Sequence, residues 1–571
     1  MLERGPAVRR GSAHPAPIAD LKGQLFAVSD EIFWCYAAGM DPFARLRGDL
    51  IGEDAVIQTP FGARRLTYAD YVASGRGLRS VEETLARVWT LYANTHTEDS
   101  ATGAHTTHLA HEALEYLKTQ FGADHSCKLV CCGSGATGAV RRLQDILGLT
   151  VPATQRERVL ASLPSEERPV VFVGPYEHHS NEVSWRETIA EVVEVPLCPR
   201  GGIDLDHLRL ALKDPRYANR PRIGSFSAAS NVTGTLSDTR SLARLLHTQG
   251  ALACFDFAAC APYVPIDMKP GRPDGYDAIF LSAHKLVGGP GAPGLLCFQQ
   301  HLYHLSAPTA PGGGTVTFVT RTRHAFVADI EAREDAGTPA ILGKLRAALA
   351  FKVKERLGTA SIKARERELI GRAIGRLRAN PRLHLLGNLE APRLAVLSFL
   401  VRTEGGHSLH PRLVVRLLND LFGIQARGGC ACAGPYGHAL LNIDDATSER
   451  YLGCITGELE GMKPGWTRLN FAPWITDETA DFLCSALEFV AEHGEKFVPL
   501  YTLDWHTGAW SHPADRPQPS LFDLPEPERE AGPVPYLDYL RAAEEIAARL
   551  DAPTPRPLPP EVPQDLVYFS Y

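Results

Sequence analysis

Short apolar runs alternate with amphipathic stretches through the middle of this chain, and this alternation restricts its fold more than any other feature. Seven runs have the length and composition of buried strands: KLVCCGSG, RPVVFVGP, EVVEVPL, RIGSFSAASN, ALACFDFAA, YDAIFLSAHK and GLLCFQ. Helical patterns such as THLAHEALEYLKTQFG and TRSLARLLHTQG lie between them. Strands that alternate with helices predict an α/β fold with a mostly parallel sheet that is covered on both faces.

Changes in this pattern divide the chain into four parts. Residues 1–65 combine a Pro- and Ala-rich arm with short helical patterns such as LFAVSDEIFWCYAAG, and residues 66–340 carry the alternation. Residues 341–497 begin with a long helical stretch and continue with the strand-like LAVLSFLV and further helical patterns. Residues 498–571 are crowded with prolines around one helical pattern, YLDYLRAAEEIAARL. We therefore expect a large domain, a smaller α+β domain and a Pro-rich extension.

Composition disfavours several classes of protein. The 571 residues carry 59 Lys and Arg against 66 Asp and Glu, a net charge of −7, whereas binding to a phosphate backbone needs a basic face. The chain has no apolar run of about 18 residues, the length that spans a membrane, and no apolar segment typical of a secretory signal. Its 12 cysteines are irregularly spaced, as is typical of reduced thiols. We expect a cytoplasmic protein with no nucleic acid and no membrane among its partners.

Asp256 and Lys285 stand at the ends of two predicted strands, ALACFDFAA and YDAIFLSAHK. Such strand ends are where α/β sheets bind their ligands, and a buried acid there must be paired or functional. Lys285 alone is typical of a solvated loop, but the two residues together form the pair that pyridoxal phosphate requires. The lysine amine forms a Schiff base with the cofactor aldehyde, and the carboxylate keeps the pyridine nitrogen protonated.

A glycine-rich turn, CGSGATG, follows the strand-like KLVC and precedes the helical pattern AVRRLQDIL. Backbone N–H groups at the start of a helix form an anion site that suits a phosphate group. A plain turn between a strand and a helix has the same composition, so the motif is informative only together with the others.

Six motifs occur in a fixed order: GSGATGAV, EHHSNEVSW, SNVTGT, DFAACAPY with SAHK, GGGT, and RGGCACAGP followed by TRLNF. With them the chain resembles the fold-type I pyridoxal-phosphate enzymes called class V aminotransferases, and within these the cysteine desulfurase and selenocysteine lyase branch. The resemblance covers about residues 66–490. It implies a large domain with a mostly parallel sheet, a smaller α+β domain and a homodimer.

The resemblance also implies which residues hold the cofactor. His178 stacks on the pyridine ring, Asp256 contacts its nitrogen, and Asn231 hydrogen-bonds the phenolic oxygen. The phosphate group is held by Ala136, Thr137, Ser282 and His284, with Thr315 reaching the phosphate of the neighbouring subunit. The sequence departs from the family at Ala259, where a glutamine is usual, and at Ala136 and Gly138, where threonine and glutamate are usual.

The substrate end is implied by two arginines and a cysteine. Arg468 matches the guanidinium that grips the substrate carboxylate, a task for which paired donors suit arginine. Arg427 opens a loop in which the family's reactive cysteine comes five residues later, at Cys432, with Cys430 as its neighbour. A thiolate on a glycine-rich loop near arginine has the exposure that sulfur attack requires. Neither these cysteines nor the His178-His179 pair has enough nearby ligands for zinc, so we expect no metal.

These residues favour a cysteine desulfurase, which takes sulfur from L-cysteine, leaves a persulfide on Cys432 and releases L-alanine. The persulfide then passes to a sulfur-acceptor protein. The alternatives are another class V enzyme, such as an aminotransferase, lyase or epimerase acting on a different amino acid, and an inactive scaffold that binds proteins. Joint retention of Lys285, Asp256, His178 and Arg468 argues against the scaffold.

Overall fold

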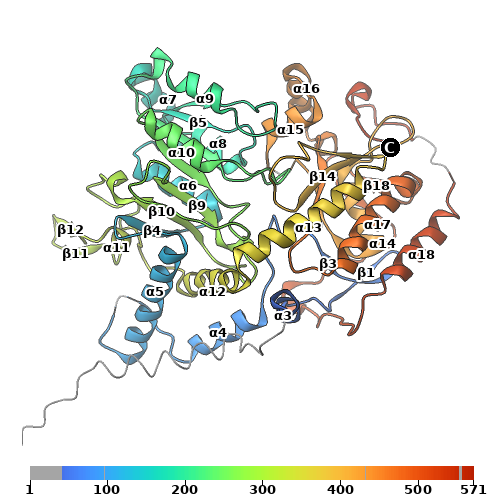
Figure 1. Cartoon of the computed structure of the whole chain (residues 1–571), viewed down its shortest axis with the longest axis horizontal. Helices are drawn as coiled ribbons and strands as arrows, with labels where there is room; N and C mark the ends of the chain where they lie inside the picture. The colour runs from blue at the N-terminus through green and yellow to red at the C-terminus, as the bar shows by residue number, and fades with distance from the viewer. Residues whose placement is uncertain (1–40, 96, 431, 552–555) are drawn as a thin grey trace, which may run out of the picture.

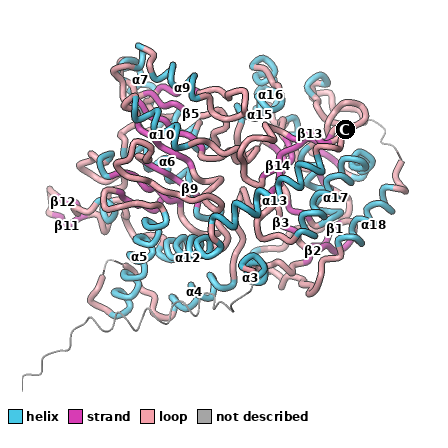
Figure 2. Tube along the Cα trace, in the orientation of Figure 1, coloured by secondary structure: helices cyan, strands magenta, loops and turns pink. Residues whose placement is uncertain are grey.

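The computed structural model describes residues 41–95, 97–430, 432–551 and 556–571 (Figures 1 and 2). The arm expected at the start of the chain and the helical pattern LFAVSDEIFWCYAAG lie outside the described residues. In the described part, a large α/β body and a smaller body lie side by side, and the long helix α13 (Thr359–Leu377) runs between them (Figure 1).

One seven-stranded sheet forms the centre of the larger body. Its order is β4-β10-β9-β8-β7-β5-β6, and all neighbours pair in parallel except β10, which is antiparallel to both β4 and β9. The seven strands coincide with the seven apolar runs, which confirms the prediction of a mostly parallel sheet. Their bounds are β4 Cys127–Cys132, β5 Val170–Val173, β6 Glu191–Glu194, β7 Arg222–Ser227, β8 Leu252–Asp256, β9 Ala278–Ser282 and β10 Gly294–Gln299.

Helices cover both faces of this sheet, because alternate strand residues point to opposite sides. In β5, Val170 and Phe172 belong to one hydrophobic cluster, and Val171 and Val173 belong to another. The first cluster includes side chains from α5 (Ala101–Gln120), α9 (Leu205–Leu212), α10 (Thr239–Thr248) and α12 (Ile341–Leu357). The second includes α6 (Gly135–Ile146) and α8 (Val183–Arg186). The remaining elements of the larger body are α4 Arg79–Trp89, α7 Ala153–Ser162, α11 Ile330–Arg333 and the hairpin of β11 Val316–Val319 with β12 His324–Phe326.

The smaller body is an antiparallel sheet of order β13-β14-β17-β16 packed against helices. Gly358, with φ of +75°, breaks the long helical stretch into α12 and α13. Its strands are β13 Leu383–Leu385, β14 Val396–Val401, β16 Arg427–Gly429 and β17 Trp466–Asn470, and its helices are α14 Pro411–Phe422, α15 Gly434–Leu441, α16 Asp445–Thr456 and α17 Asp477–His493. Together the two bodies give the predicted large domain and smaller α+β domain.

Both ends of the described chain join the smaller body. β3 (Thr67–Tyr68) pairs in parallel with β15 (Ile424–Gln425), and the hairpin of β1 (Val56–Thr59) and β2 (Gly62–Arg65) packs against α14. The Pro-rich extension contributes α18 (Tyr536–Ala547), whose apolar side chains share one hydrophobic cluster with α14 and α17. The two-stranded sheet of β18 Thr502–Leu503 with β19 Trp510–Ser511 also belongs to this body, whereas α3 (Pro42–Asp49) packs against α12 of the larger one.

Candidate active site

The carboxyl ends of β7, β8 and β9 meet the strands β16 and β17 at a cavity of about 220 Å³. β8 and β9 are parallel neighbours. Asp256, at the end of β8, and Lys285, just after the end of β9, therefore face the same space. Eleven of the residues predicted from the sequence line this cavity: Ala136, Thr137, His178, Asn231, Asp256, Ser282, His284, Lys285, Arg427, Cys432 and Arg468. Residues separated by more than 300 positions in the chain therefore lie around one space.

Asp256 is buried and Lys285 is half-buried, and their surroundings shift the pKa of both groups. Burial raises the pKa of the Asp256 carboxyl to about 6, although the Ala258 N–H, which donates to Oδ1 at 2.7 Å, and the charge of Lys285 both lower it. Burial lowers the pKa of the Lys285 amine, and the carboxylate of Asp256 opposes that shift. A lysine whose amine loses its proton more readily is a better nucleophile toward a carbonyl group.

The glycine-rich turn at the start of α6 forms one end of the cavity. Gly135 has φ of +56°, and a Cβ atom there would lie 2.7 Å from Ser282 Oγ, so only glycine fits without displacement. The Ala136 N–H donates to Ser282 Oγ at 2.9 Å, and Thr137 Oγ1 lies 2.6 Å from Ser180 Oγ. The N-cap residue Ser134 makes no side-chain hydrogen bond to the helix. Apart from the Ala136 N–H, the backbone donors of the first turn thus remain for an anion.

His178 lies in the cavity as a neutral ring. Burial first, and then the charges of Lys285 and Arg468, lower its pKa to about 4. The Ser180 N–H donates to His178 Nδ1 at 3.1 Å, so the proton of the neutral ring is on Nε2. A neutral imidazole with a fixed tautomer can stack on a flat ligand and donate one hydrogen bond from Nε2.

Arg468 is 3% exposed and is held by a residue that sequence reasoning missed. Asp70 accepts a hydrogen bond from Arg468 Nη2 at 2.9 Å through Oδ1 and another from Arg427 Nε at 2.9 Å through Oδ2. Arg468 Nη1 donates to the Asn231 carbonyl at 2.9 Å, whereas Nε has no partner among the described residues. Asp70 comes two residues after the strand β3 (Thr67–Tyr68), which is too short to show a pattern in the sequence.

Cys432 lines the cavity and is exposed, whereas the half-buried Cys430 is not among the lining residues. The Cys432 backbone has φ of +57°, a left-handed conformation that a non-glycine residue adopts at an energetic cost. His179 anchors the loop at two points: its N–H donates to the Cys432 carbonyl at 2.9 Å, and its Nε2 accepts from the Gly434 N–H at 3.0 Å. The thiol is thus presented to the cavity by a loop fixed to the larger body.

The cavity fits the pyridoxal phosphate that the sequence predicts. It combines a lysine of lowered pKa, a buried carboxyl whose Oδ2 accepts no hydrogen bond from the described residues, and backbone donors at a helix start. The buried Arg468 Nε without a partner fits a carboxylate on the substrate side. Thr315 is the exception, since it is buried in its own turn, where its Oγ1 donates to the Gly312 carbonyl at 2.7 Å.

The described residues offer neither a metal site nor a membrane-spanning helix. No cluster of three or more His, Cys, Asp or Glu side chains is arranged there to hold a metal ion. No helix in the same part of the chain has the length and apolar character to cross a membrane.

Comparisons with known proteins identify the family. Residues 67–447 match the family described as aminotransferase class-V. A cysteine desulfurase of Klebsiella pneumoniae is 32% identical over 269 residues, which are 46% of this chain and 62% of that protein. A protein of Streptomyces coelicolor named "Probable cysteine desulfurase" is 26% identical over 65% of this chain and 84% of its own length. The chain thus spans less than two thirds of the Klebsiella relative.

Solved structures agree on the fold. The apo structure of a cysteine desulfurase from Thermococcus onnurineus aligns with a TM-score of 0.61 at 20% identity, over 78% of this chain and 98% of that one. A cysteine desulfurase from Escherichia coli aligns with a TM-score of 0.60 at 22% identity, over 79% and 99%. Because the family match covers well over half of the chain, the chain belongs to the class V aminotransferase family of enzymes, with the fold-type I architecture of the cysteine desulfurases it resembles.

Proposed function

We propose that the protein is a pyridoxal-phosphate-dependent cysteine desulfurase that converts L-cysteine to L-alanine and leaves the sulfur as a persulfide on Cys432. One observation carries the proposal: the exposed thiol of Cys432, the amine of Lys285 and the guanidinium of Arg468 line one cavity. The names of the relatives, several of which are cysteine desulfurases, point to the same reaction.

In this proposal the chain itself holds the cofactor. The start of α6, with Ser282 and His284, holds the phosphate group, and Asp256 pairs with the ring nitrogen. The side chain of Asn231 meets the phenolic oxygen, and the neutral ring of His178 covers one face of the pyridine. When bound, pyridoxal phosphate supplies an electron sink for the carbon that carries the substrate amino group.

The substrate is held and processed by three further groups. Arg468 binds the carboxylate through Nε, and Asp70 keeps its guanidinium in place. Lys285 Nζ, whose pKa is lowered by burial, takes up the proton of the substrate α-carbon. The Cys432 thiolate then attacks the substrate sulfur. An S–S bond forms, the bond between the sulfur and Cβ breaks, and Cβ keeps that electron pair and gains a proton. Lys285 Nζ returns a proton to the α-carbon, and alanine leaves.

The proposal also covers the oligomeric state, the location in the cell and the acceptor of the sulfur. We propose a cytoplasmic homodimer in which Thr315 reaches the phosphate of the neighbouring subunit, and an acceptor protein that receives the sulfur from Cys432. The exposed hairpin β11-β12 supports the dimer, because Phe318 and Val319 at its tip are 68% and 59% exposed in the single chain. Apolar side chains so exposed on a projecting hairpin are typical of a surface that another chain covers.

The test combines an activity assay with mass spectrometry. We expect purified protein with pyridoxal phosphate to form alanine from L-cysteine, and Cys432 to gain one sulfur atom. Cys432→Ser should abolish both products, whereas the matched variant Cys430→Ser should retain most activity, because Cys430 is not among the lining residues of the cavity. A persulfide on Cys430, or equal loss in the two variants, would contradict the assignment of the thiol.

One observation favours a second candidate, another class V enzyme acting on a different amino acid. Ala259 lines the cavity at the position where the family usually has a glutamine, so that side-chain amide is missing from the cofactor's surroundings. Assay of a panel of amino acids separates the two. Turnover of another amino acid without sulfur transfer would establish the second candidate in place of the desulfurase.

A further inference from the structure

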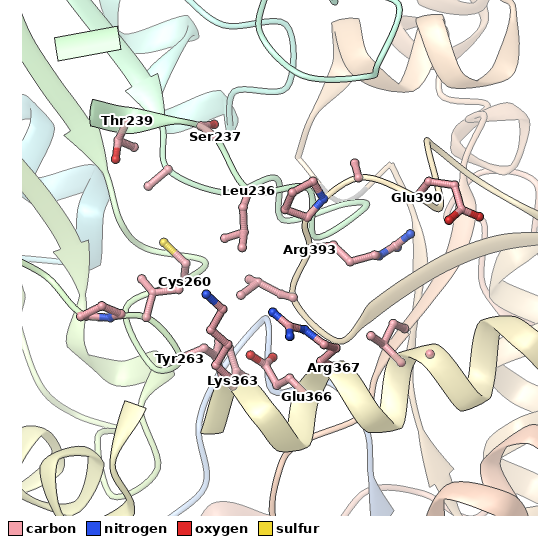
Figure 3. A pocket seen from close by; sticks show the side chains of 18 of the residues that line it. Leu236, Ser237, Thr239, Cys260, Tyr263, Lys363, Glu366, Arg367, Glu390 and Arg393 are labelled. Carbon is pink, nitrogen blue, oxygen red and sulfur yellow. The ribbon is translucent and has the colours of Figure 1, made fainter. Parts of the chain in front are cut away.

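A second cavity of about 970 Å³ lies behind the floor of the candidate active site, and it is several times larger than the cavity of about 220 Å³ described above. Figure 3 shows Lys363, Glu366 and Arg367 projecting into it from α13, opposite Leu236, with Cys260 at one end and Arg393 and Glu390 at the other. Its volume is in the range of cavities that bind metabolites.

The two cavities are separate but adjacent. They share no lining residue, yet at the carboxyl ends of β7 and β8 the last strand residue and the residue after it line opposite sides of the wall between them. Asp256 lines the candidate active site, and Phe257 lines the second cavity. In the same way, Ser227 lines the first and Ala228 the second. The second cavity is therefore not a substrate subsite of the first.

Polar groups of the second cavity lack partners. Tyr263 is 2% exposed, and its Oη has no hydrogen-bond partner among the described residues. Arg393 Nε and Nη1 are buried and equally unpartnered, although Nη2 donates to the carbonyls of Thr233 and Val396. Buried donors without partners cost free energy unless a water molecule or a ligand satisfies them. A polar group of a bound molecule could satisfy them if it displaced the side chains that now cover them.

The charged side chains of the lining determine which charge a ligand of this cavity would carry. Five basic side chains line the cavity, and Lys363 and Arg367 form no ion pair with any described residue. Three acidic side chains line it as well. Glu390 is paired with Arg378, one of the five basic residues, at 3.7 Å, and Asp267 opposes the other four. Burial raises the pKa of Glu366 to about 8, so its carboxyl is largely protonated at neutral pH and cancels little of the positive charge. The lining therefore favours an anion.

The rest of the lining is apolar and leaves open space. Leu236, Phe257 and Val264 lie on the side of the larger body. On α13, Gly371 and Gly375 lie one turn apart, and a Cβ atom at either would meet nothing within 4 Å. Glycine inside a helix costs about 1 kcal/mol of stability relative to alanine. Packing does not explain the two glycines, because a side chain at either position would meet no neighbouring atom.

We propose that this cavity is a second binding site, for a small organic anion that joins a carboxylate, sulfonate or phosphate group to an apolar body. Lys363, Arg367 and Arg393 hold the anionic group, and Tyr263 Oη and the protonated Glu366 donate further hydrogen bonds. The apolar body lies over Gly371 and Gly375. The site does not depend on the reaction proposed for the first cavity.

The test uses anilinonaphthalene sulfonate, an aromatic anion, titrated by calorimetry into the holoenzyme so that the first cavity is filled by cofactor. We expect one site per chain. Gly371→Leu fills the open space and should weaken binding by at least about tenfold. Gly453→Leu is the matched control, because Gly453 is an exposed glycine of α16 that also has nothing within 4 Å of its Cβ position.

A second pair of variants tests the charge and does not depend on filling the cavity. Arg367→Glu should weaken binding by about tenfold at low salt, and by less at high salt, because both attraction and its screening are electrostatic. Arg158→Glu should leave binding of the anion unchanged. Arg158 is an exposed arginine of α7 without an ion pair among the described residues. Thermal unfolding confirms that each variant is folded. No binding by the parent protein, or equal loss in a variant and its control, would overturn the proposal.

Discussion

At the residue scale, the candidate site depends on a carboxylate that is not among the residues lining its cavity. Asp70 joins Arg427 and Arg468 from positions 357 and 398 residues away in the chain. Without that carboxylate, two guanidinium groups would repel each other and lose their orientation toward the substrate. Asp70 is therefore a positioning residue, and its effect should appear in substrate binding before it appears in the chemical step.

We predict that Asp70→Asn raises the KM for L-cysteine by about ten- to hundredfold and changes kcat much less. The range follows from loss of a charge-assisted hydrogen bond worth about 1.5–3 kcal/mol. Steady-state kinetics measure both constants. Asp565→Asn is the control, because Asp565 forms an ion pair with Arg450 at 2.7 Å with both side chains more than half exposed. An unchanged KM in Asp70→Asn would mean that Arg468 keeps its orientation without help.

Asp256 should make the stability of the cofactor-free protein depend on pH. Burial raises its pKa from the ordinary 3.8 to about 6 in the folded state. Below pH 3.8 the carboxyl is protonated in both the folded and the unfolded chain and has no effect on stability. Between these values the unfolded chain releases the proton first, so unfolding becomes progressively more favourable as pH rises. Above pH 6 the full penalty, roughly 3 kcal/mol, is present.

We therefore predict that Asp256→Asn raises the Tm of the cofactor-free protein at pH 8 and has little effect at pH 4, while it lowers activity of the holoenzyme. Calorimetry at the two pH values measures the difference. The exposed variant Asp565→Asn should shift the Tm similarly at both. A stabilisation by Asp256→Asn that is the same at pH 4 and pH 8 would show that it does not come from the buried charge.

The sequence was informative about residues that follow directly from a strand or a motif. Asp256, Lys285 and the CGSGATG turn were found in this way, and Asp256, Lys285 and part of the turn line the cavity. Asp70 and Ser180 were not found, because their roles lie in hydrogen bonds to partners in distant segments, and periodicity carries no information about such pairs. Thr315 remains a prediction, since its expected contact lies in a second subunit.

At the scale of elements, the start of α6 offers a matched pair of glycines. We predict that Gly135→Ala lowers affinity for pyridoxal phosphate by at least about tenfold. The new Cβ would lie 2.7 Å from Ser282 Oγ, and φ of +56° adds about 1–2 kcal/mol of backbone strain. Gly133→Ala lies in the same turn, where a Cβ meets nothing within 4 Å, and should bind as the parent does. Equilibrium titration of cofactor absorbance measures both, and similar affinities would mean that this turn does not hold the phosphate.

Element types were easier to predict than element partners. All seven strands of the large sheet were visible as apolar runs bounded by turn residues, because strands buried on both faces read as continuous hydrophobic sequence. The hairpin β1-β2 and the pairing of β3 with β15 were not expected. These strands have only two to four residues, too short for alternation to show, and their partners lie far along the chain.

At the scale of the whole molecule, the Pro-rich extension belongs to the core of the smaller body. Tyr536 stacks on Phe482 of α17 with ring centroids 4.0 Å apart, and Phe569 contacts the ring of His410 at 4.6 Å. His410 is the N-cap of α14, and the carbonyl of the next residue, Pro411, accepts a hydrogen bond from Thr467 beside Arg468. The end of the chain thus supports β17, the strand that carries Arg468. The sequence does not reveal this packing, because the apolar residues of the Pro-rich extension are too scattered to form a periodic pattern.

Two phenylalanines of the extension test this view with the same substitution. We predict that Phe569→Ala, at a side chain that is 2% exposed, lowers the free energy of unfolding by about 3–5 kcal/mol, because it leaves a cavity between His410 and Trp505. Phe522→Ala, at a side chain that is 97% exposed, should change it by less than about 0.5 kcal/mol. Denaturant unfolding monitored by tryptophan fluorescence measures both values. If Phe569→Ala also cost less than about 1 kcal/mol, the extension would be an appendage that folds onto an already complete domain. If it costs the full amount and also raises the KM for L-cysteine, the last residues of the chain help to hold Arg468 in position.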